Sequence, residues 1–303
     1  GNGDVLYAGG VLRTASVALN SVPSTSGSST QAPSATDIDT GQASYLASNL
    51  GTSVNPAFVG GTLQIDSAGA TIGSDFTVSN AGGTIDANGN NSTFSGVISD
   101  AASSTGSMTF TGSGTTALTN VNTYTGSTTI NSGATLALSG SGSIAASSGV
   151  IDNGVFDISG TTSGATIKTL SGNGAVFLGT RTLTLSNAAG TFGGVVSGSG
   201  GLSVTGGSET LTGANTYTGS TTINSGATLA LSGSGSIAAS SGVIDNGVFD
   251  ISGTTSGATI KTLSGNGAVF LGTRTLTLSN AAGTFGGVVD GSGGLSVTGG
   301  SET

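Results

Sequence analysis

Short runs in which apolar and polar residues alternate recur along the chain from about residue 58. Two of them are Gly154-Val155-Phe156-Asp157-Ile158 and Arg181-Thr182-Leu183-Thr184-Leu185. Alternation with a period of two places the apolar side chains on one face of a β-strand. No segment has the 3.6-residue apolar period of a helix, and the frequent glycines, which cost about 1 kcal/mol each in a helix interior, disfavour helices further. The pattern therefore predicts an all-β chain with this core: Phe156, Ile158, Leu170, Phe177, Leu183 and Leu185.

Asn-Gly pairs separate many of the predicted strands. Such pairs reach positive φ readily and let the chain change direction about every six to ten residues. In a barrel or a sandwich these turns would close hairpins, whereas in a parallel β-helix they would lie at the corners between the faces of one coil. The pairs are Asn88-Gly89, Asn153-Gly154, Asn173-Gly174, Asn246-Gly247 and Asn266-Gly267.

A near-perfect internal repeat decides between these alternatives. Residues 122–210 recur as 215–303 with a period of 93, and across 89 aligned positions the only difference is Ser197 against Asp290. A long tandem period is typical of an array or solenoid. The period divides near Thr128, Gly149, Gly174 and Gly194 into about four coils of ~23 residues, which at ~4.8 Å per coil would be about 19 Å long. We therefore predict one β-helix segment, 1–303, in which every surface feature of the repeat occurs twice.

Residues 15–57 differ from the rest of the chain. Pro23 and Pro33 lie here, within a stretch rich in Ser and Thr. We expect a loop inserted between early coils, with a short helix around 43–50. A long irregular segment of this kind is either a flexible spacer or a place where function resides.

Composition narrows the possible functions. Glycine accounts for 57 of 303 residues, charged residues for 6%, and the mean hydropathy is +0.24, so the chain has apolar material to bury despite its low complexity. The net charge is −9, with only five Lys and Arg and no cluster of them, which excludes a nucleic-acid footprint and a polybasic membrane patch. There is no Cys, His or Trp. Disulfides, thiolate metal sites and Ser-His-acid triads are thereby excluded.

Asp152 and Asp157 form the best candidate for glycan cleavage, and Asp245 and Asp250 repeat the pair. Acid–base cleavage of a glycan needs two carboxylates roughly 5–10 Å apart. Along one strand this pair would be ~16 Å apart, unless the intervening Asn153-Gly154 turn folds the two together. Because Asp beside an Asn-Gly turn commonly makes turn hydrogen bonds, we assign no catalytic residue and no cofactor.

Two acidic segments resemble the start of a calcium loop. They are Asp37-Ile38-Asp39-Thr40-Gly41 and Asp86-Ala87-Asn88-Gly89-Asn90. Neither is followed by the Glu that completes an EF-hand, so ordinary Asx turns are the preferred interpretation and we assign no metal ligand.

Three kinds of side chain are candidates for ligand contact. Lys168 and Arg181 either are solvated, pair with Asp152 or Asp157 on a neighbouring coil, or contact an anionic glycan. Tyr124 either packs at a coil corner or is exposed for contact with a sugar. The copies of these residues are Lys261, Arg274 and Tyr217. The ligand-binding residues therefore stay unknown.

The order of short motifs in the repeat resembles a known family. The stretch Thr191–Leu202 leads into Thr210–Leu229, and the same order recurs from Thr93–Ser99 into Asn122–Leu136. This order resembles the passenger-associated strand repeat of bacterial autotransporters and covers most of 58–303. One departure is Ser208-Glu209, which replaces a turn that often contains Lys, and another is the insertion at 15–57.

The resemblance implies a right-handed parallel β-helix, exported by type V secretion and displayed on or released from a Gram-negative surface. It also implies that the chain is a segment of a longer passenger whose translocator β-barrel lies outside these residues. An outer-membrane-associated, extracellular location follows from it.

Our leading hypothesis is a structural and adhesive stalk, not an enzyme, which serves attachment, aggregation or biofilm formation. Its partners would be glycans or proteins of host or bacterial surfaces, or further copies of itself. An alternative is a self-assembling extracellular filament or sheath, because solenoids need capped ends to stay monomeric. A glycan-acting β-helix with Asp37 and Asp39 in its site is a third hypothesis.

Overall fold

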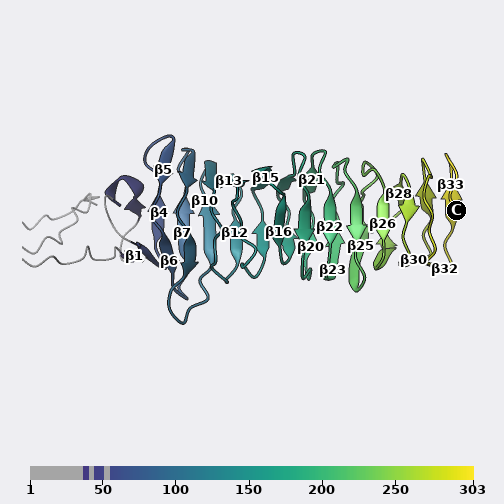
Figure 1. Cartoon of the computed structure of the whole chain (residues 1–303), viewed down its shortest axis with the longest axis horizontal. Coiled ribbons are helices and arrows are strands. Elements are labelled where there is room, and N and C mark those ends of the chain that lie inside the picture. Colours follow the sequence, from purple (N-terminus) through teal and green to yellow (C-terminus); the bar gives the residue numbers. More distant parts are fainter. Residues whose placement is uncertain (1–36, 41–43, 51–54) are drawn as a thin grey trace, which may run out of the picture. The chain divides into compact units, whose positions relative to one another are not determined.

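The protein is a parallel β-solenoid, seen in a computed structural model that describes residues 37–40, 44–50 and 55–303. The described residues belong to one compact unit, Pro33–Thr303. Within it the chain winds in successive turns, and strands of neighbouring turns lie side by side (Figure 1). The ladders between them are parallel. The prediction of an all-β parallel solenoid is confirmed.

In the described part of this unit, five sheets form the walls. The longest has 13 strands: β2 Tyr45–Leu46, β4 Thr62–Gln64, β7 Gly83–Asp86, β10 Met108–Thr111, β12 Thr128–Ile130, β14 Val150–Asp152, β17 Leu170–Gly172, β20 Thr191–Phe192, β23 Gly207–Leu211, β25 Ala227–Gly233, β27 Val248–Thr254, β30 Ala268–Gly272 and β32 Val288–Gly291. A second has seven: β5 Ala70–Ile72, β8 Ser92–Phe94, β11 Gly114–Leu118, β13 Ala134–Gly140, β15 Val155–Thr161, β18 Ala175–Phe177 and β21 Val195–Ser197.

The three remaining sheets are shorter. One has six strands: β16 Ala165–Ile167, β19 Leu183–Leu185, β22 Leu202–Val204, β24 Thr221–Ile223, β26 Val243–Asp245 and β29 Leu263–Ser264. One has four: β1 Asp37–Asp39, β3 Ala57–Val59, β6 Phe76–Val78 and β9 Ile98–Asp100. The last has three: β28 Ala258–Ile260, β31 Leu276–Leu278 and β33 Leu295–Val297.

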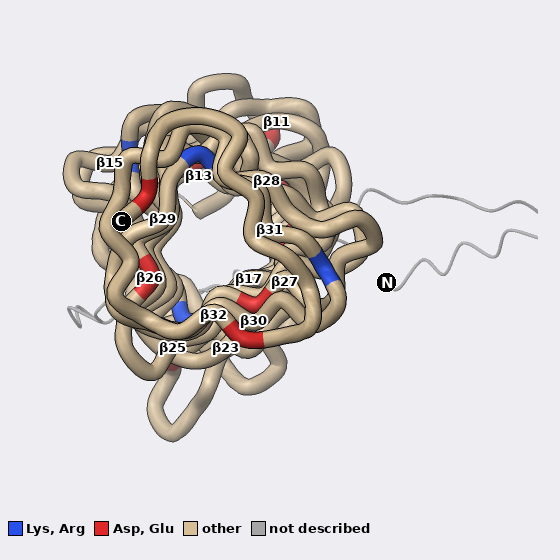
Figure 2. The backbone as a smooth tube through the Cα atoms, turned by 90° about the vertical axis from the view of Figure 1, so that its right-hand side faces the viewer, with Lys and Arg blue, Asp and Glu red and all other residues tan. Residues whose placement is uncertain are grey.

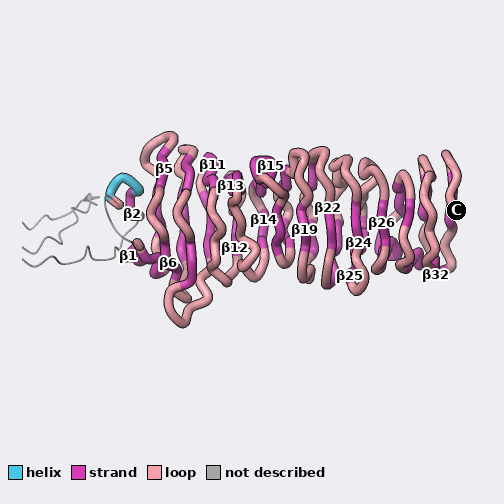
Figure 3. The backbone as a smooth tube through the Cα atoms, in the orientation of Figure 1, coloured by secondary structure: helices cyan, strands magenta, loops and turns pink. Residues whose placement is uncertain are grey.

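Each turn of the middle of the unit contributes one strand to each of three walls. The chain passes from β14 in the 13-stranded sheet to β15 in the seven-stranded sheet and β16 in the six-stranded sheet, and returns at β17. Short strands alternate with loops and turns along the winding chain (Figure 3). Met108 pairs with Thr128 and Thr128 with Val150, so one turn takes 20 and then 22 residues.

Because of the alternating pattern, every second residue of a strand points inward, and apolar side chains fill the interior. The rings of Phe58 and Phe76 stack with centroids 5.3 Å apart, and the ring of Phe94 packs against Phe76 at 5.8 Å in a tilted arrangement. All three rings are buried. Buried side chains of this size supply most of the favourable free energy of folding, because each removes a large apolar area from water.

The 93-residue period does not equal a whole number of turns. From β14 the 13-stranded sheet continues through β17, β20 and β23 to β25, and these steps make four turns. The copy of β14, however, is β26, which lies two faces further along the chain, in the six-stranded sheet. Likewise β15 lies in the seven-stranded sheet, whereas its copy β27 lies in the 13-stranded sheet. The prediction of four coils of about 23 residues is wrong. The turns are shorter, so the repeat makes four turns and two faces and adds ~22 Å at ~4.8 Å per turn.

Most of the predicted insertion at 15–57 lies outside the described residues. Of its described parts, β1 pairs with β3 and β2 pairs with β4. A short 3-10 helix, η1, spans Ala47–Asn49. No helix in the described part of the chain has the length and hydrophobicity needed to traverse a bilayer.

Candidate functional site

The two carboxylates of the candidate catalytic pair face opposite sides of the wall. Asp152 ends β14 and is buried, at an inward position in register with Ile130. Asp157 lies between the buried Phe156 and Ile158 of β15 and therefore faces outward. The two groups cannot flank one glycosidic bond, because the wall of the solenoid separates them.

Burial changes the acidity of Asp152. Its Oδ1 accepts a hydrogen bond from the backbone N–H of Gly154 at 3.0 Å, as expected of a turn, but its Oδ2 has no hydrogen-bond partner. Desolvation raises the pKa of Asp152 to about 7, and the Gly154 amide opposes this only in part. Its copy, Asp245, has the same hydrogen-bond pattern, with Oδ1 accepting from the backbone N–H of Gly247 and Oδ2 without a partner, and burial raises its pKa to about 6.

Glu209 is a second carboxylate inside the solenoid. By resemblance to the passenger repeat, Ser208-Glu209 takes the place of a turn, but the pair lies in β23, where Glu209 is buried in register with Leu229. Neither carboxylate oxygen has a hydrogen-bond partner of good geometry, although the backbone amides of Gly190 and Leu170 lie close to the carboxylate. Burial raises the pKa of Glu209 to about 8, partly opposed by the backbone amides of Gly190 and Leu170. A buried carboxyl of this kind holds its proton near neutral pH and has no contact with a solvent-borne substrate.

The basic residues of the repeat brace neighbouring turns. Lys168 donates through Nζ to the carbonyl of Ala146 at 2.7 Å, and Arg181 donates through Nη1 to the carbonyl of Thr162 at 2.9 Å. The partners are thus backbone carbonyls one turn back, not the side chains of Asp152 or Asp157. The copies make the same contacts: Lys261 with Ala239 at 2.8 Å and Arg274 with Thr255 at 3.0 Å.

The repeated tyrosines are packed inside, as the corner-packing alternative predicts. Tyr124 and Tyr217 are fully buried. The Tyr124 hydroxyl hydrogen-bonds with Oγ1 of Thr128 at 2.7 Å, and the Tyr217 hydroxyl with Oγ1 of Thr221 at 2.6 Å. Neither ring is available for contact with a sugar.

The calcium-like segment at 86–90 forms an Asx turn. Asp86 Oδ1 accepts from the backbone N–H of Asn88 at 2.9 Å, and its Oδ2 accepts from Nε2 of Gln64 at 3.3 Å. The other such segment begins in β1, where Asp37 and Asp39 are exposed. Within the described ranges, no three acidic, His or Cys side chains gather in a metal-binding group.

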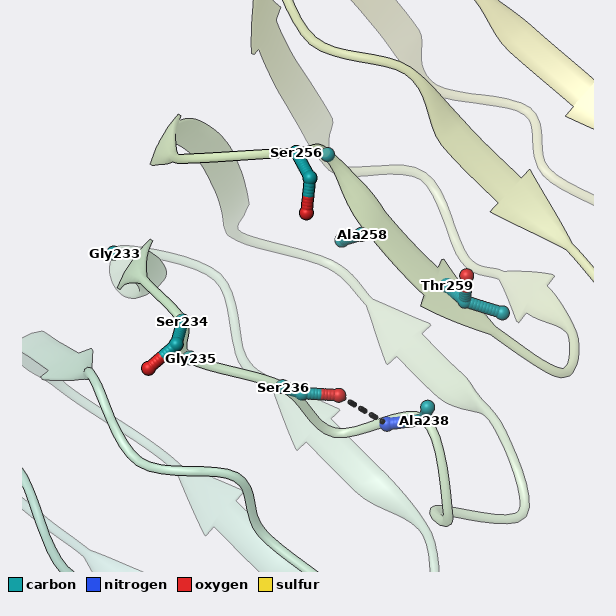
Figure 4. Close-up of a pocket in the computed structure, with 9 residues that line it drawn as sticks. Gly233, Ser234, Gly235, Ser236, Ala238, Ser256, Ala258 and Thr259 are labelled. Carbon is teal, nitrogen blue, oxygen red and sulfur yellow. Dashed lines mark hydrogen bonds between the residues drawn. The ribbon is translucent and has the colours of Figure 1, made fainter.

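Two equivalent shallow pockets lie at the same corner of the two copies. One, of about 220 Å³, lies between the bend at 233–238 and that at 256–259, and its copy of about 200 Å³ lies 93 residues earlier. Figure 4 shows the first, whose only drawn hydrogen bond runs from the backbone N–H of Ala238 to Oγ of Ser236 at 3.3 Å. Gly, Ser, Ala and Thr line both pockets. They offer hydroxyl groups but no charge and no aromatic ring.

An exposed aromatic ring marks the outer wall of each copy. Phe177, predicted to be in the core, is 45% exposed, and its copy Phe270 is 39% exposed. The prediction is wrong because Val176 is in register with the buried Phe156, which turns the next residue outward. We define the Phe177 patch as Phe177 with its outward neighbours in register, Asp157 and Ser197.

The Phe270 patch is the corresponding group in the second copy. It consists of Phe270 with Asp250 and Asp290, its outward neighbours in register. The local sequence could not identify either patch. Ala175-Val176-Phe177-Leu178 contains no alternation that says which residues face inward.

Taken together, the fold and surface define a repetitive β-solenoid with duplicated polar and aromatic surface features. Residues 108–138 and 206–231 match the family model of the passenger-associated-transport-repeat. The first match runs from β10 to β13 and the second from β23 to β25, so each covers at least one turn. Comparisons with curated proteins and with solved structures find no match. These repeats on a parallel β-solenoid fit an autotransporter passenger built of β-strand repeats, a class that is secreted to the cell surface.

Proposed function

We propose that this chain is a structural and adhesive stalk. It extends a β-solenoid from the outer membrane of the bacterium and serves attachment, aggregation or biofilm formation without catalysing a reaction. Its partners are glycans or proteins of host or bacterial surfaces. The passenger repeats support the surface location, and the separation of Asp152 from Asp157 argues against a glycan-cleaving pair.

The geometry of the repeat is the observation that supports this proposal most directly. Each 93-residue block adds four turns and two faces, so it lengthens the solenoid and moves the same outward side chains to a neighbouring face. A duplication of this kind increases reach and displays the same surface around the axis. It creates no new cleft, because each turn contacts mainly its neighbours.

Deletion of residues 122–214 from the passenger as displayed on cells tests the proposal. The deletion removes one block and leaves Asn215 after Val121, where Asn122 stood, so the junction keeps its native sequence. We expect the purified passenger to be shorter by ~22 Å in electron micrographs and the cells to adhere less strongly, but not to lose adhesion. The passenger with both blocks, expressed at the same surface density, is the control.

Two results would count against a stalk. One is unchanged adhesion together with polyuronide turnover that Asp37→Asn or Asp39→Asn abolishes, since that pattern belongs to an enzyme. The other is complete loss of adhesion after a single substitution that leaves the fold and the length intact.

A further inference from the structure

The single difference between the two copies lies beside the exposed aromatic ring. Ser197 is in register with Phe177, and Asp290 is in register with Phe270. In the first copy the Ser197 hydroxyl donates to the carbonyl of Val176 at 3.3 Å, so it is engaged with the wall. Asp290 is exposed and lacks a hydroxyl for that contact, so it presents a carboxylate to solvent.

Two carboxylates flank the ring of Phe270. Asp250 precedes Phe270 in the outward column of the 13-stranded sheet and Asp290 follows it. With ~4.8 Å between neighbouring strands, the backbones of the two acids lie ~10 Å apart with the ring between them. Figure 2 shows acidic positions of the backbone beside β30 and β32. The Phe177 patch has the same ring but only one carboxylate, that of Asp157.

The charge of this patch indicates the chemistry of its partner. The ring face carries partial negative charge and attracts a cation, and the flanking carboxylates add to that attraction. The whole chain has a net charge of −9. Lys261 and Arg274 donate to the backbone carbonyls of Ala239 and Thr255 and not to the carboxylates of the patch. An anionic glycan would be repelled, and a neutral glycan would gain little from the exchange of Ser for Asp.

We propose that the Phe270 patch binds a Lys or Arg side chain of a basic protein segment, with the cation over the ring of Phe270 and between Asp250 and Asp290. The Phe177 patch binds the same group more weakly, because Asp157 is its only carboxylate. This inference deepens the proposed adhesive function and rests on it only for display of the chain at the cell surface.

The two patches act independently. Phe177 lies in the seven-stranded sheet and Phe270 in the 13-stranded sheet, so they point from different faces, ~22 Å apart along the axis. One flat partner surface can contact one patch but not both. The chain therefore binds two separate basic partners, one at each patch, and does not bind one partner at both patches.

Calorimetric titration of the purified 303-residue chain with a penta-lysine peptide tests the proposal. A salt concentration of about 0.1 M limits charge effects to ~10 Å, so that only local carboxylates matter. A Phe177→Ala background leaves the Phe270 patch as the aromatic site. Circular dichroism and thermal unfolding check that every variant keeps the fold.

We expect Phe270→Leu, which keeps apolar bulk but removes the ring, to weaken binding about two- to five-fold. We expect Asp290→Ser, which restores the first-copy residue, to weaken binding about two-fold. The reverse exchange, Ser197→Asp in a Phe270→Ala background, should strengthen binding by about the same factor. Asp37→Ser removes an exposed carboxylate of β1, many turns away, and should leave the affinity unchanged.

Two outcomes overturn the proposal. Equal weakening by Asp37→Ser and Asp290→Ser, with no effect of Phe270→Leu, would show general attraction to an acidic chain. Binding of maltohexaose in place of penta-lysine, lost in Phe270→Leu, would assign the ring to neutral glycans. Either result leaves the proposed stalk standing, because that proposal depends on length and cell adhesion and not on this patch.

Discussion

Replacing Glu209 by Gln should remove a pH-dependent weakness from the middle of the solenoid. Burial raises the pKa of Glu209 from 4.5 to about 8 in the folded chain. The folded state therefore holds the proton that the unfolded state releases above pH 4.5. Because the folded state binds more protons in this range, the stability that this proton provides is complete below pH 4.5 and is lost as the pH rises towards 8.

The size of the effect follows from this shift. Each pH unit between the two pKa values costs about 1.4 kcal/mol, so the free energy of unfolding should fall by about 3 to 4 kcal/mol between pH 5 and pH 8 on account of Glu209 alone. This is an upper value, because local opening that admits water to the carboxylate relieves part of the cost. Gln has the same shape, stays neutral, and keeps a carbonyl oxygen near the amides of Gly190 and Leu170.

Guanidinium unfolding followed by circular dichroism at pH 5 and at pH 8 measures the difference. The Glu209→Gln variant and the unmodified chain should have similar midpoints at pH 5, and the variant should be clearly more stable at pH 8. Asp290→Asn, which removes an exposed carboxylate, is the matched control and should change neither midpoint by much. The reasoning would be refuted if Glu209→Gln lost as much stability between the two pH values as the unmodified chain.

Two further predictions concern packing. Phe156→Ala should destabilise the chain by about 3–5 kcal/mol because the ring is fully buried. Phe177→Ala should change stability by less than about 0.5 kcal/mol because that ring lies on the outer wall. Thermal unfolding of the two variants measures the difference. A midpoint lowered equally by both would contradict the assignment of Phe177 to the surface. Gly190→Ala would place its Cβ 1.9 Å from the carbonyl oxygen of Leu170, so we expect a loss of about 3 kcal/mol or more, while Gly73→Ala, with no atom nearer than 3.8 Å, should be tolerated. Comparable expression and midpoints for the two glycine variants would refute the close approach.

The sequence predicted the elements of the candidate site better than their orientation. The sequence indicates Asp157 as a candidate site residue but pairs it with the wrong residue, Asp152. Its outward neighbour is Phe177, 20 residues later, and not Asp152. The lateral register between turns places these residues together, and no local motif encodes that register.

The buried carboxylates show the same limit. In Val150-Ile151-Asp152 the polar residue would ordinarily be placed outside. Ile130, in register with Asp152, fixes that position inward, and Ile151 is left 40% exposed. Which of two alternating sets faces the core depends on the neighbouring turn.

The sequence by itself determined the class of fold. Period-two alternation, the absence of a helical period and a tandem repeat of 93 residues were enough to specify a parallel β-solenoid, because these signals are local or exact copies. Only the tertiary structure decided how many residues make one turn, and therefore on which face of the solenoid each residue lies. The number of residues per turn sets how far each block rotates and which side chains of the repeat reach the surface, and it arises from packing between segments about 20 residues apart. The block is therefore a unit of both length and rotation.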